Sequence, residues 1–209
     1  MINKIVLGSS SPRRKEILSM LGLPYEVVVP DTDESSEPAE SPEKYVCVLA
    51  KAKCDAVAQK LIGQGKNIAD TLIISCDTIV YYDGFIIGKP ESEMHAKLTL
   101  GMLSDSWHTV YSGLCLRCGE QVCEDFCTTK VKFAELSRNE IDEYVKTGEP
   151  MGKAGSYAAQ LRGSSFVERI DGDFFNVMGL PVSTLCKMIK TEFNTDVFEL
   201  SKRLSEVRK

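Results

Sequence analysis

The sequence lacks any run of about 20 apolar residues, the length that a membrane-spanning helix needs. It also lacks an export signal, because Met1–Gly8 turns polar too early for one, and we therefore expect a cytoplasmic protein with no membrane partner. Histidine is scarce, and His95 and His108 have no partner at a metal-binding spacing. The net charge of -5 and the pI of about 5.2 argue against a general affinity for nucleic acid.

Eight cysteines are present, but their positions indicate neither a disulfide framework nor a zinc site. Thiols are expected to stay reduced in a chain without an export signal. Cys115 and Cys118 lie on one predicted strand at a spacing that places their sulfurs on opposite faces. Cys123 and Cys127 share a face of the next strand, but the rise of a strand separates them by about 13 Å. We interpret the cysteines as small core or surface residues.

Hydrophobic periodicity indicates strands and helices that alternate at first and give way to hairpins later. Strands are predicted at 2–7, 25–29, 72–76, 79–82, 85–87, 110–118 and 122–133, and helices at 12–21, 42–61, 92–103, 137–146, 181–189 and beyond 195. This order predicts an α/β fold in which helices pack on a mixed sheet, formed by a single domain over residues 1–209. A C-terminal helical tail is expected at about 192–209. Its Val197, Leu200 and Leu204 could pack on the body of the domain or on a partner, and the former is more usual.

The first cluster with chemical content runs from Ser9 to Arg14, at the junction of a predicted strand and a predicted helix. Backbone N–H groups and the dipole at a helix N-terminus favour an anion there. Ser9, Ser10 and Ser11 add hydroxyl donors, while Arg13 and Arg14 add charge and a bidentate geometry that suits phosphate. An ordinary capped helix with two solvated arginines is the alternative.

Asp77 follows a predicted buried strand, and ligands gather at the carboxyl ends of strands in open α/β sheets. A carboxylate at this place can hold Mg²⁺ or take a proton from water, whereas the alternative is a turn-forming aspartate. Lys89, just after a predicted hairpin, would stabilise charge on phosphoryl oxygens if the turn directs it toward Asp77. Lys53 on a helix and Glu34 in an acidic loop are weaker candidates, since each could be a solvated surface group.

Seven short blocks of the sequence occur in an order that is typical of one known family. They are Leu7–Arg14, Asp33-Glu34, Leu49–Lys53, Asp77–Val80, Gly88–Pro90, Lys153–Tyr157 and Val177–Pro181. Their content and order resemble the Maf (septum-formation inhibitor) family over about residues 5–185, which is nearly the whole chain. So many ordered blocks rarely arise by chance. Gly8 replaces the alanine that is usual in the family, an exchange that we expect to be harmless.

The resemblance implies an elongated mixed sheet of the Maf/inosine-triphosphatase type, with flanking helices and two lobes around a central cleft. It implies an enzyme that hydrolyses a nucleoside triphosphate between the α- and β-phosphates, with a divalent cation, Mg²⁺ or Mn²⁺, as cofactor. By this resemblance Asp77 is the general base, Lys53 and Lys89 assist it, and Glu34 and Asp77 hold the metal. The implied substrate-binding residues at the triphosphate are Ser9, Ser11, Arg13 and Arg14. A homodimer is implied as well.

Gln160 bears on the choice of base, because it falls where the branch of the family that cleaves dTTP and UTP carries a glutamine. Arg13 and Thr78 occupy the other positions that the family associates with this choice. The resemblance therefore implies dTTP and UTP as substrates, with modified pyrimidine nucleotides as further candidates. Two departures from the family pattern lie nearby. Gly152 stands where an aspartate is common, and 158–163 is poorer in glycine than usual.

Other functions compete with this one. A non-catalytic nucleotide-binding regulator of cell division would suit the family's historical link to septum formation, but such a binder has no need of a base beside the phosphates. A kinase-like enzyme is disfavoured, because the sequence has neither a Walker A loop nor a kinase motif set. The same hydrolysis with another base preference is the third alternative.

Overall fold

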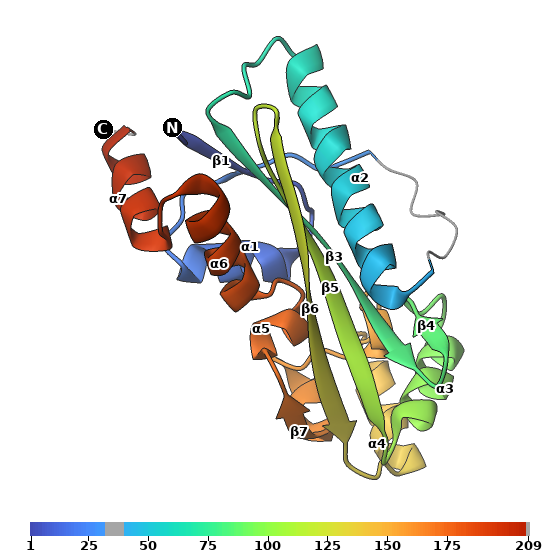
Figure 1. Ribbon diagram of the computed structural model, residues 1–209. Coiled ribbons are helices and arrows are strands. Elements are labelled where there is room, and N and C mark those ends of the chain that lie inside the picture. The colour runs from blue at the N-terminus through green and yellow to red at the C-terminus, as the bar shows by residue number, and fades with distance from the viewer. Residues whose placement is uncertain (32–39, 208–209) are drawn as a thin grey trace. The chain divides into compact units, whose positions relative to one another are not determined.

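The structure is a computed structural model that describes residues 1–31 and 40–207 (Figure 1). Seven strands and seven α-helices lie in this part of the chain, and they confirm the predicted α/β class. In chain order they are β1 Lys4–Leu7, α1 Pro12–Met20, β2 Glu26–Val27, α2 Pro42–Gly63, β3 Thr71–Tyr82, β4 Phe85–Ile87, α3 Glu93–Leu103, β5 Trp107–Cys118, β6 Gln121–Phe133, α4 Arg138–Lys146, β7 Val167–Asp171, α5 Phe174–Met178, α6 Val182–Phe193 and α7 Val197–Val207. No helix of the described ranges combines the length and the apolar content of a membrane span.

The strands form one sheet in the order β2-β1-β3-β5-β6-β7, with β4 attached to β3. β1 is parallel to β2 and β3, whereas β4 and β7 run antiparallel to their partners, so the sheet is mixed as predicted. Leu7 of β1 lies opposite Ile74 of β3, and Val80 of β3 lies opposite Ile87 of β4. Residues 75–79 of β3 therefore lie beyond the last pair with β1 and before the first pair with β4.

The chain is organised as two compact units. The first comprises Met1–Asp77, Ser112–Cys127 and Gly179–Lys209, and the second comprises Thr78–Tyr111 and Thr128–Met178. Because the boundaries fall inside β3, β5 and β6, each of these strands contributes residues to both units. That the units behave as one domain over residues 1–209 stays a prediction.

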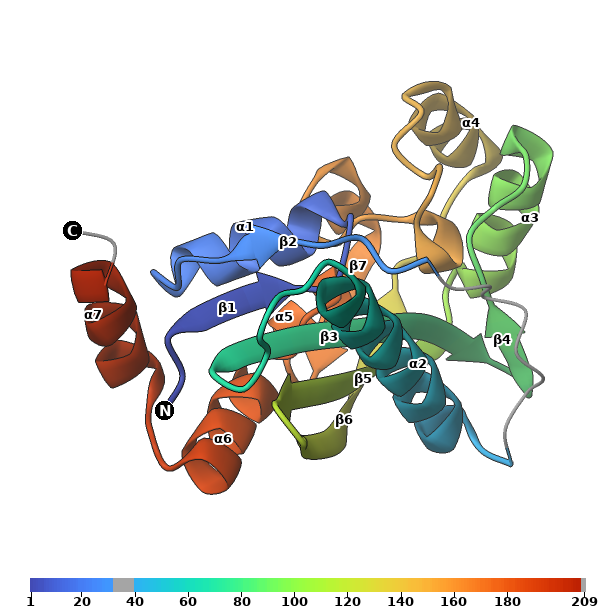
Figure 2. The ribbon, with the colours of Figure 1, turned by 90° about the horizontal axis from the view of Figure 1, so that it is seen from above.

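In the first unit, α2 packs along one face of β1 and β3 (Figures 1 and 2). It begins at Pro42 behind Ser41, whose hydroxyl accepts the N–H of Lys44 at 3.3 Å as an N-cap. The buried residues of α2 recur every three or four positions and form one stripe. They are Val46, Leu49, Ala50, Lys53, Cys54, Val57, Ala58 and Leu61. This spacing places the lysine of the stripe, Lys53, on the side that faces the sheet.

Helices α1 and α6 lie on the other face of this part of the sheet (Figure 1). Ile17 and Leu18 of α1 are fully buried, and Leu21 is only half-buried because the helix ends at Met20. Helix α7 packs near the end of α1, where the hydroxyl of Ser201 donates to the carbonyl of Gly22 at 2.6 Å. The apolar residues of α7 that we expected to pack are buried: Val197, Leu200 and Leu204.

The second unit has its own apolar core, which β5, β6, α3 and α4 supply. Three rings meet edge-to-face at its centre: Phe133 lies 4.9 Å from His108 and 4.8 Å from Tyr157 between ring centroids. His108 is 2% exposed, and its Nε2 is 2.8 Å from the hydroxyl of Tyr157. The helix α4 begins with a capping box between Ser137 and Glu140.

Candidate active site

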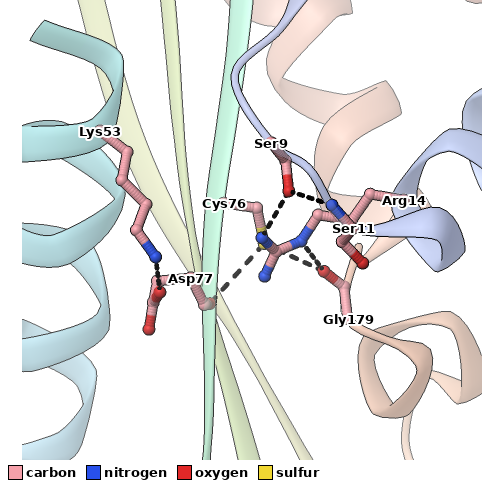
Figure 3. Close-up of polar contacts among 7 residues, drawn as sticks. All are labelled: Ser9, Ser11, Arg14, Lys53, Cys76, Asp77 and Gly179. Atoms are coloured by element: carbon pink, nitrogen blue, oxygen red, sulfur yellow. Dashed lines mark hydrogen bonds and ion pairs between the residues drawn. The ribbon is translucent and has the colours of Figure 1, made fainter. Parts of the chain in front are cut away.

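Lys53 and Asp77 form a largely buried ion pair across the space between α2 and β3 (Figure 3). The Lys53 Nζ lies 2.5 Å from Asp77 Oδ1, and the two side chains are 10% and 13% exposed. At this low exposure each charge is stabilised by the other, because a charge buried without compensation is costly. The structure thus brings together two of the residues that were predicted to act in catalysis.

Asp77 lies in the middle of β3, which runs from Thr71 to Tyr82, and the prediction that it follows the end of a strand is wrong. The apolar run stops at Cys76, but the backbone stays extended because β-branched and aromatic residues continue the strand. Asp77 nevertheless lies just beyond the carboxyl end of a neighbouring strand, since the pairing of β1 with β3 stops at Leu7. The rule that ligands gather at such ends therefore applies through β1.

A hydrogen bond joins Ser9, in the loop between β1 and α1, to Arg14 in the first turn of α1. The Arg14 Nη1 donates to Ser9 Oγ at 3.1 Å, and the backbone N–H of Ser11 donates to the same oxygen at 3.2 Å. Ser11 occupies the N-cap position of α1, but its side chain makes no capping hydrogen bond. The Ser11 hydroxyl therefore does not cap the first turn of the helix, whose N-terminal dipole favours an anion.

The carbonyl of Gly179 orients Arg14 from a second side. Arg14 Nε donates to this oxygen at 2.8 Å, and the thiol of Cys76 donates to it at 3.2 Å (Figure 3). A carbonyl oxygen has two lone pairs and can accept both hydrogen bonds. Because two nitrogens of the guanidinium bind protein groups, the plane of its charge is fixed before any ligand arrives.

These contacts lie on opposite sides of β3. Consecutive residues of a strand point to opposite faces, and Cys76 and Asp77 follow this rule (Figure 3). Asp77 faces Lys53 of α2, whereas Cys76 faces the carbonyl that binds Arg14. The predicted residues of the first unit are thus gathered into two groups, the Lys53–Asp77 pair and the Ser9–Arg14 group.

Arg13 is half-buried and adjoins Arg14 at the start of α1. Burial, and after it the positive charge of Arg14, lower the pKa of Arg13 from its ordinary value. Both causes disfavour the charged guanidinium, although arginine keeps its charge at neutral pH. A phosphate bound here would oppose both effects, so the electrostatics of this helix start favour an anion.

The other predicted residues belong to the second unit or lie outside the described part of the chain. Thr78 follows Asp77 on β3 and points to the opposite face. Lys89 is exposed in the loop between β4 and α3. Glu34, which was predicted to hold a metal, lies outside the described residues. The binding and catalytic roles of these three residues stay predictions.

Gln160 occupies a short turn of the second unit and is half-buried. Its Oε1 is buried and accepts no hydrogen bond from the residues that the structure describes. A buried acceptor without a donor is uncommon in folded proteins, so this amide oxygen is suited to a ligand or a bound water. The amide offers both a donor and an acceptor, which are the groups needed to read the edge of a base.

That a divalent cation binds at Asp77 stays a prediction. Within the described ranges, His, Cys, Asp and Glu side chains form no cluster of three or more that could enclose an ion. Mg²⁺ does not require one, because it commonly binds one or two carboxylates together with substrate phosphates and water. Asp77, with Glu34 as the second predicted carboxylate, would suit this mode.

Gly8 has a packing role that the sequence did not reveal. A Cβ added to it would lie 2.4 Å from Ser75 Oγ and 3.1 Å from Val57 Cγ2. Both neighbours are fully buried, so the alanine that is usual in the family would be overpacked in this chain. Glycine fits at position 8 of this chain, whereas alanine at the same position would collide with Ser75.

Two members of the Ser9–Arg14 group were missed by sequence reasoning. Gly179 belongs to the block Val177–Pro181, so the resemblance marked the segment but not the contact that its carbonyl makes. Cys76 gave no signal, because its thiol acts on a carbonyl 103 residues away in the sequence.

The fold and these groups define an α/β protein with an arginine–serine cluster at a helix start and a buried lysine–carboxylate pair. A family model described as Maf-like protein matches residues 4–192, and the chain belongs to this family. The resemblance that was drawn from seven short blocks is confirmed.

Relatives from three Bacillus species cover nearly the full chain. A dTTP/UTP pyrophosphatase of Bacillus cereus (strain AH820) is 42% identical over 94% of this chain and 98% of its own length. Proteins of the same name from Bacillus thuringiensis subsp. konkukian (strain 97-27) and Bacillus anthracis are 42% and 41% identical over the same shares. Among solved structures, the Staphylococcus aureus Ham1 protein gives a TM-score of 0.42 at 17% identity, over 63% of this chain and 72% of that one. A TM-score of this size does not establish a common fold.

Proposed function

We propose that this protein hydrolyses dTTP and UTP to the nucleoside monophosphate and pyrophosphate. Its family supports this, as do relatives named dTTP/UTP pyrophosphatase that are 42% identical and matched over 98% of their length. The observation of the structure that carries the proposal is the Lys53–Asp77 pair, because hydrolysis needs a carboxylate that can take a proton from water.

In the proposed reaction, the oxygen of water bonds to the α-phosphorus while the bond from this phosphorus to the bridging oxygen of pyrophosphate breaks. The electron pair of the broken bond leaves with pyrophosphate, and Asp77 takes a proton from the attacking water. Lys53 binds Oδ1 of Asp77, which leaves Oδ2 to receive that proton. A divalent cation, when bound, supplies charge neutralisation for the triphosphate.

Positive side chains are proposed to stabilise the negative charge of the triphosphate during the reaction. Arg13, Arg14 and Lys89 would offset the charge of the triphosphate, and Ser9 and Ser11 would donate hydrogen bonds to it. In phosphoryl chemistry, positioning and electrostatic stabilisation supply most of the rate. The fixed guanidinium of Arg14 suits this role, because it needs no reorganisation when the ligand binds.

The choice of base is proposed to depend on Gln160. Uracil and thymine present a carbonyl oxygen and an N3–H side by side, and the amide of a glutamine can pair with both. Arg13 and Thr78, which the family associates with base choice, are proposed to contribute. Pyrimidine nucleotides with a modified base that keeps this edge belong to the same proposed substrate class.

The proposal extends to cofactor, assembly and location. Mg²⁺ or Mn²⁺ is proposed as the cofactor, held by Asp77 and Glu34 together with the substrate. A homodimer is proposed from the family resemblance. The proposed substrates are nucleotides of the cytoplasm, which is therefore the proposed compartment.

Hydrolysis of UTP, dTTP, CTP, GTP and 7-methylguanosine triphosphate with Mg²⁺ tests the proposal, with pyrophosphate and phosphate assayed separately. Pyrophosphate release should be strongest from UTP and dTTP, and Asp77→Asn should lower it by about a hundredfold or more. Asp83→Asn, at an exposed turn between β3 and β4, is the matched control and should keep normal turnover. Near-normal turnover in Asp77→Asn would contradict its role as the base.

The same panel separates the alternatives. Pyrophosphate released mainly from another nucleotide would retain the enzyme and overturn the base preference. Binding of nucleotides without turnover of any would contradict the proposal and favour a regulator. Gln160→Ala should change the ratio of rates between UTP and CTP, and an equal fall for all nucleotides would contradict its role in base selection.

A further inference from the structure

The turn that carries Gln160 is held at both ends by two side chains that sequence reasoning did not single out. It comprises Ala158–Leu161 and is closed by the N–H of Leu161, which donates to the carbonyl of Ala158 at 3.2 Å. Gln160 is its third residue. The place from which the Gln160 side chain extends therefore depends on what fixes the backbone before and after this turn.

Tyr144 of α4 fixes the start of the turn. Its hydroxyl accepts the N–H of Ala158 at 3.2 Å, in a site where Tyr144 is 5% and Ala158 is 2% exposed. The ring of Tyr144 packs edge-to-face on Phe166 at 4.8 Å between centroids. Because both partners are buried, the loss of this acceptor would leave a backbone N–H of the turn unsatisfied.

Glu149 fixes the residues that follow the turn. Its Oε1 accepts the N–H of Gly163 at 2.9 Å, and its Oε2 accepts the N–H of Arg162 at 3.2 Å. The same Oε1 accepts the hydroxyl of Tyr144 at 2.9 Å. Burial, together with the hydrogen bond to Glu149, raises the pKa of Tyr144, so its hydroxyl stays protonated and able to donate. Hydrogen bonds to a carboxylate are stronger than those between neutral groups.

The backbone of Glu149 is itself held by two side chains. The N–H of Glu149 donates to the hydroxyl of Thr147 at 3.1 Å, and its carbonyl accepts from Lys153 Nζ at 2.5 Å. Gly163 shows how closely the parts approach, because a Cβ there would lie 2.7 Å from the Tyr144 hydroxyl. Tyr144 and Glu149 therefore form a clamp. Tyr144 binds the first residue of the turn, and Glu149 binds the two residues that follow it.

Base selection by a glutamine requires an amide in a defined position and orientation for a chemical reason. The amide has a donor on one side and an acceptor on the other, and a half-turn about its last bond exchanges them. In one orientation it matches the O4 and N3–H of uracil, and in the other it matches the N4 amino group and N3 of cytosine. A glutamine can thus discriminate between these bases only if its orientation is fixed. Hydrogen bonds to the backbone do not restrain this rotation, but they fix the position of the side chain relative to the base, on which the pairing depends.

We propose that Tyr144 and Glu149 are positioning residues that fix the backbone on both sides of Gln160 and so hold its side chain where the amide can pair with uracil rather than cytosine. The inference rests on the proposed function of the protein and adds to it the residues that make the glutamine selective. Neither side chain is proposed to touch the reacting atoms, so their effect should fall on discrimination between bases.

The test compares kcat/KM for UTP and for CTP in wild type, Tyr144→Phe and Glu149→Gln. Tyr144→Phe keeps the ring against Phe166 but removes the hydroxyl, and Glu149→Gln keeps one acceptor and removes the other. Each variant should lower the UTP to CTP ratio by about tenfold, because a displaced amide no longer pairs better with one base than with the other. Glu143→Gln is the matched control, because Glu143 is 62% exposed and its carboxylate pairs with Lys146, and it should leave the ratio unchanged.

A second comparison shows whether the effect passes through Gln160. If it does, adding Tyr144→Phe to Gln160→Ala should change the base ratio by less than twofold beyond Gln160→Ala alone. A full further loss in the double variant would overturn the inference. Equal losses for UTP and CTP in both clamp variants would overturn it too, since that result indicates a structural role only.

Two measurements keep this inference separate from the proposed function. If wild type releases no pyrophosphate from UTP, the proposed function fails, whatever the variants do. If wild type is active and selective while both clamp variants keep its base ratio, only the inference fails. Should Tyr144→Phe not fold, amide hydrogen exchange on Glu149→Gln decides. Faster exchange at Arg162 and Gly163 with a lowered ratio supports the clamp, and an unchanged ratio refutes it.

Discussion

Replacement of Lys53 by methionine should destabilise the protein strongly, because it removes the ammonium that lies 2.5 Å from the Asp77 carboxylate. The two side chains are 10% and 13% exposed, which places the pair near the buried limit. Removing one partner of a buried pair costs about 3–5 kcal/mol, whereas an exposed pair contributes about 0–1 kcal/mol. For a chain of this size, the midpoint of thermal unfolding should fall by about 10 °C.

The same helix supplies a matched control. Lys51 pairs with Asp55 at 2.9 Å, but these side chains are 44% and 34% exposed. Lys51→Met should therefore change the free energy of unfolding by less than about 1 kcal/mol. Urea denaturation followed by circular dichroism measures both variants. If the two units unfold in separate steps, the effect of Lys53→Met should appear in the step of the first unit, which contains both partners.

A double variant decides whether the effect belongs to the pair. Lys53→Met combined with Asp77→Leu replaces both charges by apolar groups and should recover most of the lost stability, because neither charge is then left buried. This variant should be folded and inactive, which would separate the structural role of the pair from its proposed catalytic role. Costs that add within about 0.5 kcal/mol would refute the reasoning, since partners in contact are not additive.

Two further predictions concern buried residues, one in the second unit and one in the first. Burial lowers the pKa of His108 to about 4, so the folded protein binds its proton less readily than the unfolded chain, whose histidine has a pKa of about 6.5. Stability from this group is present above pH 6.5 and is lost as the pH falls toward 4, by about 2 kcal/mol between pH 7 and pH 5. Urea titrations should show this slope in wild type and in the control His95→Asn, but not in His108→Gln; an equal slope in all three would contradict it. Gly8→Ala should cost about 1–3 kcal/mol through contact with Ser75 Oγ, and Ser75→Ala in the same chain should restore most of it. Gly63→Ala, whose added Cβ meets nothing within 4 Å, is the control, and a failure of Ser75→Ala to rescue Gly8→Ala would exclude this contact as the cause.

The elements that local rules describe were predictable from the sequence. Helix α2 begins at Pro42 behind Ser41, and Asp83-Gly84 joins β3 to β4, as turn and capping chemistry indicated. Strand β7 was not predicted, because Val167–Asp171 is short and mostly exposed and carries no alternating apolar pattern. Its antiparallel pairing with β6 is a long-range contact that no local window contains.

The candidate site was predictable in residue type and order but not in its contacts. The sequence pointed to Arg14 and to Asp77, yet Arg14 is oriented by a carbonyl 165 residues away. Lys53 was a weak candidate because a lysine on a helix is usually solvated, and only the packing of α2 showed that it faces Asp77. Contacts of this kind depend on tertiary structure, so the sequence alone indicates the participants without their partners.

The register of β3 determines which group each of its residues serves. Side chains alternate along a strand, so Asp77 pairs with Lys53 on one face. On the other face Cys76 donates to the carbonyl of Gly179, which also accepts from Arg14. A slip of one residue would exchange the two faces and bring the carboxylate to the side of Arg14. The pairs Leu7–Ile74 and Val80–Ile87 prevent this slip on both sides of Asp77. The sheet pairings, which contain no chemical group of the site, therefore decide that the carboxylate meets Lys53 on one face of β3 and lies on the face opposite Cys76.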